Sequence, residues 1–98
     1  MIVEENSVLA SLVKTNMQLL QKCLSSSNKA IFIAAIENLK NASNNFGPAL
    51  NKHLPLALQF VKKKQDLASV ERIHELKAIL IANGGSEAEI IVSRAELK

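Results

Sequence analysis

Residues 28–64 have the sequence NKAIFIAAIENLKNASNNFGPALNKHLPLALQFVKKK. Two apolar patterns of helical period meet in this segment at Phe46-Gly47-Pro48. A glycine just past one helix can take the left-handed conformation that closes it, and a proline at the start of the next helix needs no partner for its missing N–H. The segment therefore predicts two antiparallel helices joined by a tight turn.

Before this turn the pattern predicts two helices. The first spans about residues 7–24 and ends at the polar run Ser25–Asn28. Asn28 can cap the second helix, because its side chain can accept a hydrogen bond from a backbone N–H of the first turn. The expected buried faces are Leu9, Leu12, Val13, Leu20, Cys23 and Leu24 in the first helix, and Phe32, Ala35, Ile36, Leu39, Ala42 and Ser43 in the second.

A third helix is expected to begin at Pro48. Pro55 should kink it without ending it, because proline has no N–H to donate to the Asn51 carbonyl. The expected buried face is Leu50, Leu54, Ala57, Leu58 and Val61.

A fourth helix starts at Asp66 or Ser69 and stops at Asn83-Gly84-Gly85, since paired glycines end a helix. Ser86 and Glu89 have the spacing of a capping box for a fifth helix. The expected core positions are Ile73, Leu76, Ile79 and Leu80 in the fourth helix, and Ala88, Ile91, Val92 and Ala95 in the fifth.

The predicted fold class is all-α, because no segment alternates apolar and polar residues between turn signals as a strand would. The 98 residues form one small domain, with helix pairs over about 7–43 and 48–83 and a C-terminal helix over about 86–97. Such lengths suit a short right-handed α-solenoid of about five helices, in which each antiparallel pair stacks on the next. A compact helical bundle is the alternative, and periodicity alone does not separate the two.

Positive charge is concentrated in the middle of the chain. Residues 14–64 contain eight lysines and one glutamate, a net charge of +7, whereas the segments before and after carry −2 each. A basic block favours an acidic partner. In the solenoid, the turns after Cys23 and Val61 lie on one edge, opposite the edge that carries Asn44, Asn45 and Asn83. We name as the lysine edge the residues expected there: Lys22, Lys29, Lys62, Lys63 and Lys64.

A purely structural interpretation of the lysine run stays open. Lysines in the last turn of a helix interact favourably with the helix dipole, by about 0.3–1 kcal/mol per charge. The run Lys62-Lys63-Lys64 at the end of the third helix fits this description.

Three segments carry a family resemblance: Ala30–Leu39, then Phe46-Gly47-Pro48-Ala49-Leu50-Asn51-Lys52-His53-Leu54, and Glu71–Leu80 followed by Gly84-Gly85. Together they resemble the C-terminal half of the Parkin co-regulated protein family, most of all its Parkin co-regulated-like branch, over roughly two-thirds of the chain. Those proteins place a similar Gly-Pro-x-Leu-Asn-x-His-Leu segment after an apolar helix, and a Gly-Gly pair before a short Ile-rich helix.

The resemblance implies a helical repeat similar to HEAT and armadillo repeats, and association with microtubules, notably the ciliary axoneme. The chain departs from the family at Val92–Lys98, where the family continues into an Ile/Val-Pro-Thr-Tyr ending, and it lacks the family's N-terminal helices. We therefore expect the first helix to expose a face that stacks on a preceding repeat in the family, and self-association through uncapped ends.

The sequence predicts no enzyme, no cofactor and no small-molecule substrate. His53 and His74 each stand alone among helix residues, so we expect no metal site. His53 is interpreted as a packing or turn-bonding residue rather than an acid–base group. Cys23 lies on an apolar face and is expected to be a buried small hydrophobe. Gly84-Gly85 does not follow a strand, so it is not a phosphate-binding loop.

Three functional classes remain, all with macromolecular partners. The first is a protein-binding module whose lysine edge meets acidic tubulin or an axonemal protein. The second is a general protein-interaction scaffold whose apolar groove takes an amphipathic helix. Nucleic-acid binding is third, because no aromatic residue is placed to stack on a base and no arginine lies among the clustered charges.

The expected location is the cytoplasm, at the cytoskeleton or cilium. A single cysteine suits a reducing compartment. No membrane partner is expected, because the longest strictly apolar run is Ala30–Ile36, whereas a membrane span needs about 20 residues.

Overall fold

The structure, a computed structural model, describes the backbone of residues 2–98 and the side chains from Val8 onward. The described chain contains no strand, so the all-α prediction is confirmed. Its α-helices are α1 (Ile2–Leu24), α2 (Lys29–Phe46), α3 (Leu54–Lys64), α4 (Val70–Gly84) and α5 (Ser86–Ala95), and two 3-10 helices, η1 (Gly47–His53) and η2 (Gln65–Leu67), flank α3.

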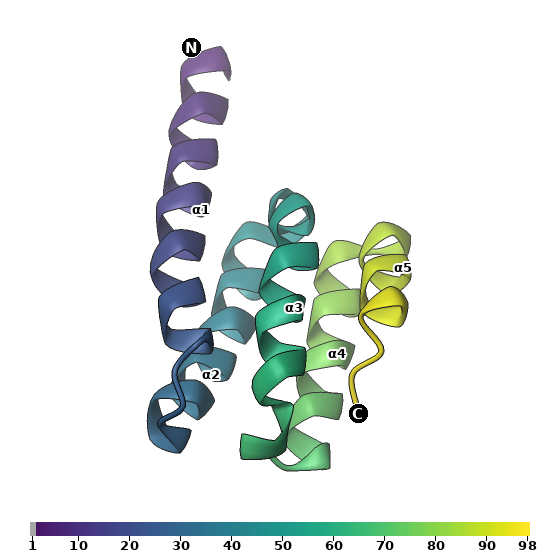
Figure 1. The fold of residues 1–98 in the computed structure, drawn as a ribbon. Helices are drawn as coiled ribbons and strands as arrows, with labels where there is room; N and C mark the ends of the chain where they lie inside the picture. The colour runs from purple at the N-terminus through teal and green to yellow at the C-terminus, as the bar shows by residue number, and fades with distance from the viewer. Residues whose placement is uncertain (1) are drawn as a thin grey trace.

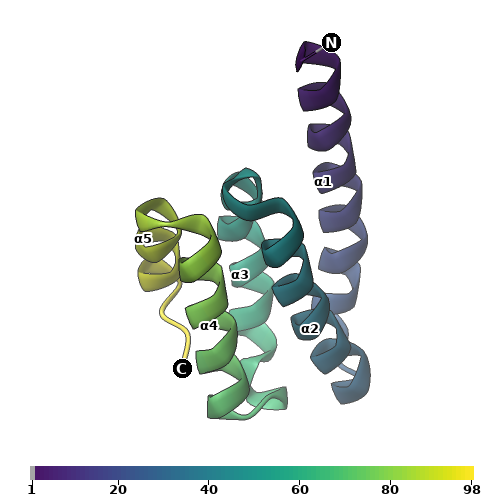
Figure 2. The ribbon, with the colours of Figure 1, turned by 180° about the vertical axis from the view of Figure 1, so that it is seen from behind.

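The helices pack in two layers, and successive α-helices run in opposite directions (Figure 1). In one layer α3 contacts both α1 and α5, and in the other α2 contacts α4. The layers are joined because α1 also packs on α2, and α4 on α5. The opposite view shows α1 at one end of the molecule, with its N-terminal half extending beyond the other helices (Figure 2).

One hydrophobic core lies between the layers and receives side chains from all five α-helices. The buried faces expected for the second and third helices are confirmed at every position. A fully buried aliphatic or aromatic side chain stabilises the fold by about 1.5–3 kcal/mol. The largest fully buried side chains include Phe32, Met17, Leu24, Ile36, Leu39 and Leu50.

The first helix differs from the prediction in its start and in its buried face. It begins at Ile2 rather than near residue 7. Leu9 and Leu12, expected in the core, are 38% and 56% exposed, whereas Met17 is buried. The reason is its position at the end of the molecule, where neighbours cover only one side of α1 (Figure 2).

The tight turn after the second helix is confirmed. Gly47 has a φ of 58°, and its N–H closes α2 by donating to a carbonyl four residues back. The expected kinked third helix is instead η1 followed by α3. The Leu54 N–H donates to the Asn51 carbonyl, three residues back, because Pro55 cannot supply the donor that an α-helix would direct there.

Two of the expected helix caps are present. The Asn28 Oδ1 atom accepts a hydrogen bond from the Ile31 N–H at 3.2 Å. The Ser69 Oγ atom accepts one from the Arg72 N–H, also at 3.2 Å, so α4 starts after Ser69. Asp66, the alternative start, lies in η2.

The capping box expected for the fifth helix is wrong. Gly85 has a φ of 78° and directly precedes α5, and its carbonyl accepts a hydrogen bond from the Glu89 N–H. Ser86 is therefore the first helical residue, and its side chain makes no capping bond. The helix ends at Ala95, slightly earlier than expected.

Candidate protein-interaction surface

The end of α3 lies beside the turn between α1 and α2, where the lysine edge is expected. Lys64, at the end of α3, donates from Nζ to the Oγ atom of Ser27, in the turn between α1 and α2, at 3.1 Å. Lys22 lies in the last turn of α1, and Lys29 is the first residue of α2. Lysines from three helices therefore lie around the same pair of turns.

The members of the lysine edge differ in their surroundings. The Lys62 Nζ atom lies 3.4 Å from a Glu96 carboxylate oxygen, in an exposed ion pair. The Lys63 Nζ atom lies 5.9 Å from the centroid of the Phe60 ring, within the range of a cation–π interaction. Among the side chains from residue 8 onward, no carboxylate forms an ion pair with four of the lysines: Lys22, Lys29, Lys63 and Lys64.

A shallow groove between α1 and α3 adjoins the lysine edge. Its lining contains no acidic residue and consists of Gln18, Gln21, Lys22, Ser25 and Phe60. The aromatic ring and the amide side chains offer packing and hydrogen bonds beside the lysine charges, so a protein surface could be held there by more than charge alone.

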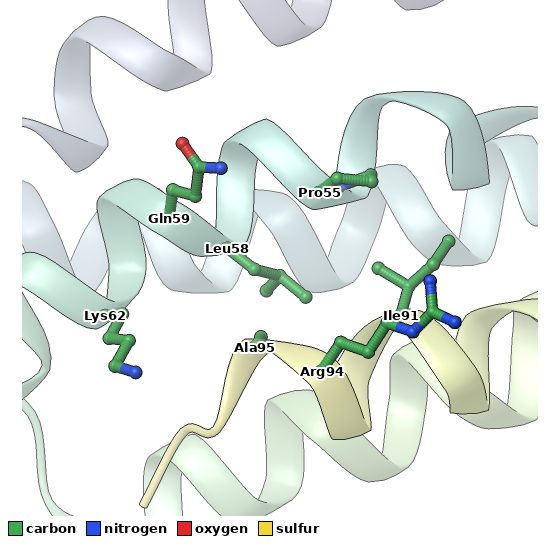
Figure 3. Close-up of a pocket in the computed structure, with 7 residues that line it drawn as sticks. All are labelled: Pro55, Leu58, Gln59, Lys62, Ile91, Arg94 and Ala95. Carbon is green, nitrogen blue, oxygen red and sulfur yellow. The ribbon is translucent and has the colours of Figure 1, made fainter.

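A second groove, of about 350 Å³, lies between α3 and α5 (Figure 3). Leu58 on α3 and Ile91 on α5 contribute apolar side chains, and Pro55 lies at one end. Lys62 and Arg94 add positive charge to the same lining. An apolar groove bordered by cations suits an acidic amphipathic segment.

Sequence reasoning missed a charge network between α2 and α4. Lys40 is only 7% exposed, and its Nζ atom pairs with Glu37 and lies 2.8 Å from Glu75 Oε1. Arg72 Nη1 donates to Glu37 Oε1 at 2.6 Å. Lys40 was counted in the basic block, but the network neutralises it. The only local signal was Glu37, three residues before Lys40.

The network shifts the pKa values of Lys40 and Glu75. Burial alone would lower the pKa of Lys40, but the hydrogen bonds to Glu37 and Glu75 outweigh burial and raise it. The hydrogen bond from Lys40 in turn lowers the pKa of Glu75. Both groups therefore keep their charges over a wide pH range.

Asparagines join the helices at the opposite edge. The Asn83 Nδ2 atom donates to Asn44 Oδ1 at 2.7 Å and to Ser43 Oγ at 3.2 Å. The Asn51 Nδ2 atom donates to the Gly84 carbonyl at 3.0 Å. A Cβ atom on Gly84 would overlap the Asn51 side chain, so this close approach requires glycine.

The two histidines and the cysteine lie in different surroundings. His53 is half-buried, and its Nε2 atom is buried without a hydrogen-bond partner. Burial, with smaller effects from Lys52 and Lys14, lowers the pKa of His53, which fits a packing residue. His74 is exposed, and Cys23 is half-buried rather than fully buried. Within the described residues no three His, Cys, Asp or Glu side chains gather as a metal site would require.

No helix in the described part of the chain has the length and apolar character to cross a membrane. Comparison with protein-family models, with curated proteins and with solved structures finds no match. The resemblance to the Parkin co-regulated family therefore stays a prediction.

Proposed function

We propose that the chain is a non-catalytic protein-binding module that docks its lysine edge on an acidic protein surface. The observation that carries this proposal is that the end of α3 lies beside the turn between α1 and α2, as the 3.1 Å contact of Lys64 Nζ with Ser27 Oγ shows. Cations from α1, α2 and α3 can then act on one partner. Unpaired charges of one sign on one surface speed encounter with a complementary partner and select against basic ones.

Stabilisation of helix ends does not account for the whole lysine edge. Lys22 and the run Lys62–Lys64 lie in last turns, where the helix dipole favours a cation. Lys29 is the first residue of α2, where the dipole opposes a cation. A positive charge kept at an unfavourable helix end supports a role in binding.

The acidic partner we propose is tubulin or an axonemal protein, following the resemblance to the Parkin co-regulated family. The two layers of antiparallel helices support the related proposal of a short right-handed α-solenoid of the HEAT or armadillo type. Under this proposal the protein works in the cytoplasm, at the cytoskeleton or cilium.

Microtubule co-sedimentation tests the proposal. The wild-type chain should pellet with microtubules, and less of it should pellet at about 150 mM than at about 50 mM salt, because salt screens exposed charges. The double variant K29E/K63E reverses two exposed charges of the lysine edge and should weaken binding at least about tenfold. Both residues lie outside α1, so the variant leaves that helix unchanged.

The matched control is K14E/K52E, which reverses two exposed lysines away from the lysine edge and changes the net charge equally. Binding by the control should stay close to that of the wild type. Equal loss in both variants would show that only net charge matters, and the lysine edge would be rejected. Absence of pelleting by the wild type at low salt would reject tubulin.

A second candidate function rests on the groove between α3 and α5. Its apolar lining with Lys62 and Arg94 favours a scaffold that holds an acidic amphipathic segment without tubulin. The variant R94E would then abolish capture of an acidic amphipathic peptide, measured by fluorescence anisotropy, and leave microtubule binding unchanged. Equal peptide binding by wild type and R94E would reject this candidate.

A further inference from the structure

Three consecutive serines, Ser25, Ser26 and Ser27, form most of the turn between α1 and α2. Two of them are tied to that turn by their own hydroxyl groups. The Ser25 Oγ atom donates to the Lys22 carbonyl at 2.9 Å, and the half-buried Ser26 Oγ atom accepts from the Asn28 N–H at 3.1 Å. Ser27 is different, because its side chain is exposed and bonds to a distant part of the chain.

The hydroxyl group of Ser27 has one partner, and that partner is a cation. Its oxygen accepts a hydrogen bond from the Lys64 ammonium group at the end of α3. Among the hydrogen bonds of the described side chains, none uses the Ser27 hydroxyl as a donor, so its proton is free. A phosphoryl group on this oxygen would therefore be attached beside an ammonium group that is already in place.

The surroundings of Ser27 contain further positive charge and little negative charge. Lys29 follows two residues later, in the first turn of α2. Glu37 is the only acidic residue in the sequence between positions 6 and 64, and it is already paired within the contact between α2 and α4. A phosphate group carries about 1.5–2 negative charges at neutral pH and three acceptor oxygens, so one group can pair with two lysines.

We propose that Ser27 is a phosphorylation site, and that its phosphate pairs with Lys64 and Lys29 and thereby closes the lysine edge to an acidic partner. The closing of the edge rests on the proposed function, whereas the phosphate site itself does not. Transfer comes from the γ-phosphoryl group of ATP on a serine kinase. The bond from the γ-phosphorus to the bridging oxygen breaks, a new bond joins the phosphorus to Ser27 Oγ, ADP leaves with the bridging oxygen, and a base of the kinase takes the hydroxyl proton.

The sequence around Ser27 indicates the class of kinase. Lys22 precedes Ser27 by five residues and Lys29 follows it by two, with no acidic residue between them. Kinases discriminate among substrates partly by such charge patterns. The inferred enzyme is therefore a serine kinase with an acidic substrate groove.

The expected loss of binding follows from the change in charge. The variant K29E/K63E changes the charge of the lysine edge by about −4 and should weaken binding at least about tenfold. A phosphate on Ser27 changes it by about −2, which is half as much. On a logarithmic scale, half of that effect is a loss of at least about threefold.

Phosphorus NMR tests the phosphate site without any partner, on the chain with phosphoserine introduced at position 27. Nearby cations favour the dianion, so the pH midpoint of the phosphate titration should lie about half a pH unit lower than in the same chain with K64A. The matched variant K52A removes an exposed lysine away from the lysine edge and should leave the midpoint unchanged. Equal midpoints with and without K64A would overturn the pairing of the phosphate with Lys64.

Mass spectrometry tests the acceptor serine. The unmodified chain is incubated with MgATP and a serine kinase that selects a lysine two residues after the serine. One phosphate on Ser27 is expected, and it should be missing from the variant S27A. A result in which Ser27 carries no phosphate would reject it as the acceptor.

Co-sedimentation with microtubules tests the closing of the edge. The chain with phosphoserine at position 27 should bind at least about threefold more weakly than the unmodified chain, whereas phosphoserine at Ser11, exposed in the N-terminal half of α1, should change binding little. Equal binding with and without the phosphate on Ser27, alongside weaker binding by K29E/K63E, would overturn the closing and leave the proposed function standing. An unmodified chain that fails to bind would reject tubulin, and the K64A midpoint would then decide the phosphate site by itself.

Discussion

Two regions of the molecule use charged residues in opposite ways. One is the contact between α2 and α4, and the other is the lysine edge. Between α2 and α4, Lys40 pairs with Glu37 and Glu75, and Arg72 pairs with Glu37. At the lysine edge most cations have no carboxylate partner among the described side chains. Charges that join helices are satisfied within the fold, whereas charges on the edge remain available to a partner. The first group should therefore govern stability, and the second binding.

The largest expected effect on stability comes from Lys40. The variant K40A removes a buried ammonium group together with its hydrogen bonds to two carboxylates, and should lower the free energy of unfolding by about 1.5–3 kcal/mol. The carboxylates are 43% and 62% exposed, so water partly solvates them and keeps the loss from growing larger. Urea denaturation followed by circular dichroism measures the change.

The matched control for this measurement is K63A at the lysine edge. Lys63 is exposed, and its truncation should lower the free energy of unfolding by less than about 1 kcal/mol, the upper size of an exposed cation–π contact such as the one with Phe60. A second variant, K40M, keeps the aliphatic stem and separates lost packing from lost charge. Equal losses for K40A and K63A would remove the distinction between the two regions.

Local signals in the sequence made most of the fold predictable. The cap residues Asn28 and Ser69, the glycine at Gly47 and the apolar spacing of α2 and α3 each act within a few residues. The pairing of Lys40 with Glu75 could not be predicted, because the residues are 35 positions apart and meet only when α2 packs on α4. The contact of Lys62 with Glu96 likewise depends on how α5 folds back on α3.

The first helix shows a different limit of sequence reasoning. Its apolar residues form two stripes, and the sequence gives both the same helical period. Which stripe becomes core depends on the side from which α2 and α3 approach, so the expected burial of Leu9 and Leu12 was wrong. The lysine edge was easier to place, because alternating turns in an antiparallel series of helices must return to the same side.

A pH dependence of stability is expected from His53, the last residue of η1. Burial lowers the pKa of His53, whose Nε2 atom has no hydrogen-bond partner. The unfolded chain therefore takes up a proton below about pH 6.5, where the folded chain still resists it. The free energy of unfolding should be constant above that pH and fall as the pH drops through it. Denaturation at about pH 7.5 and 5.5 measures the fall.

The variant H53Q should flatten this pH dependence, because glutamine does not titrate. The matched control H74Q changes an exposed histidine and should keep the fall seen in the wild type. In this pH range Glu75 stays ionised, since its pKa is lowered by Lys40. An equal slope in wild type and H53Q would show that burial of His53 imposes no penalty on its protonation.

The smallest expected effect comes from the hydrogen bond between Lys64 and Ser27 at the lysine edge. The variant S27A removes the acceptor of the Lys64 ammonium group but changes no charge. Because the bond is exposed, its loss should cost less than about 0.5 kcal/mol, and co-sedimentation with microtubules should stay close to wild type. If S27A instead lowered the free energy of unfolding by more than about 1.5 kcal/mol, Lys64 would belong with Lys40 as a residue that holds helices together. The edge would then serve the fold as the α2–α4 contact does, and only Lys22, Lys29 and Lys63 would remain as residues available for binding.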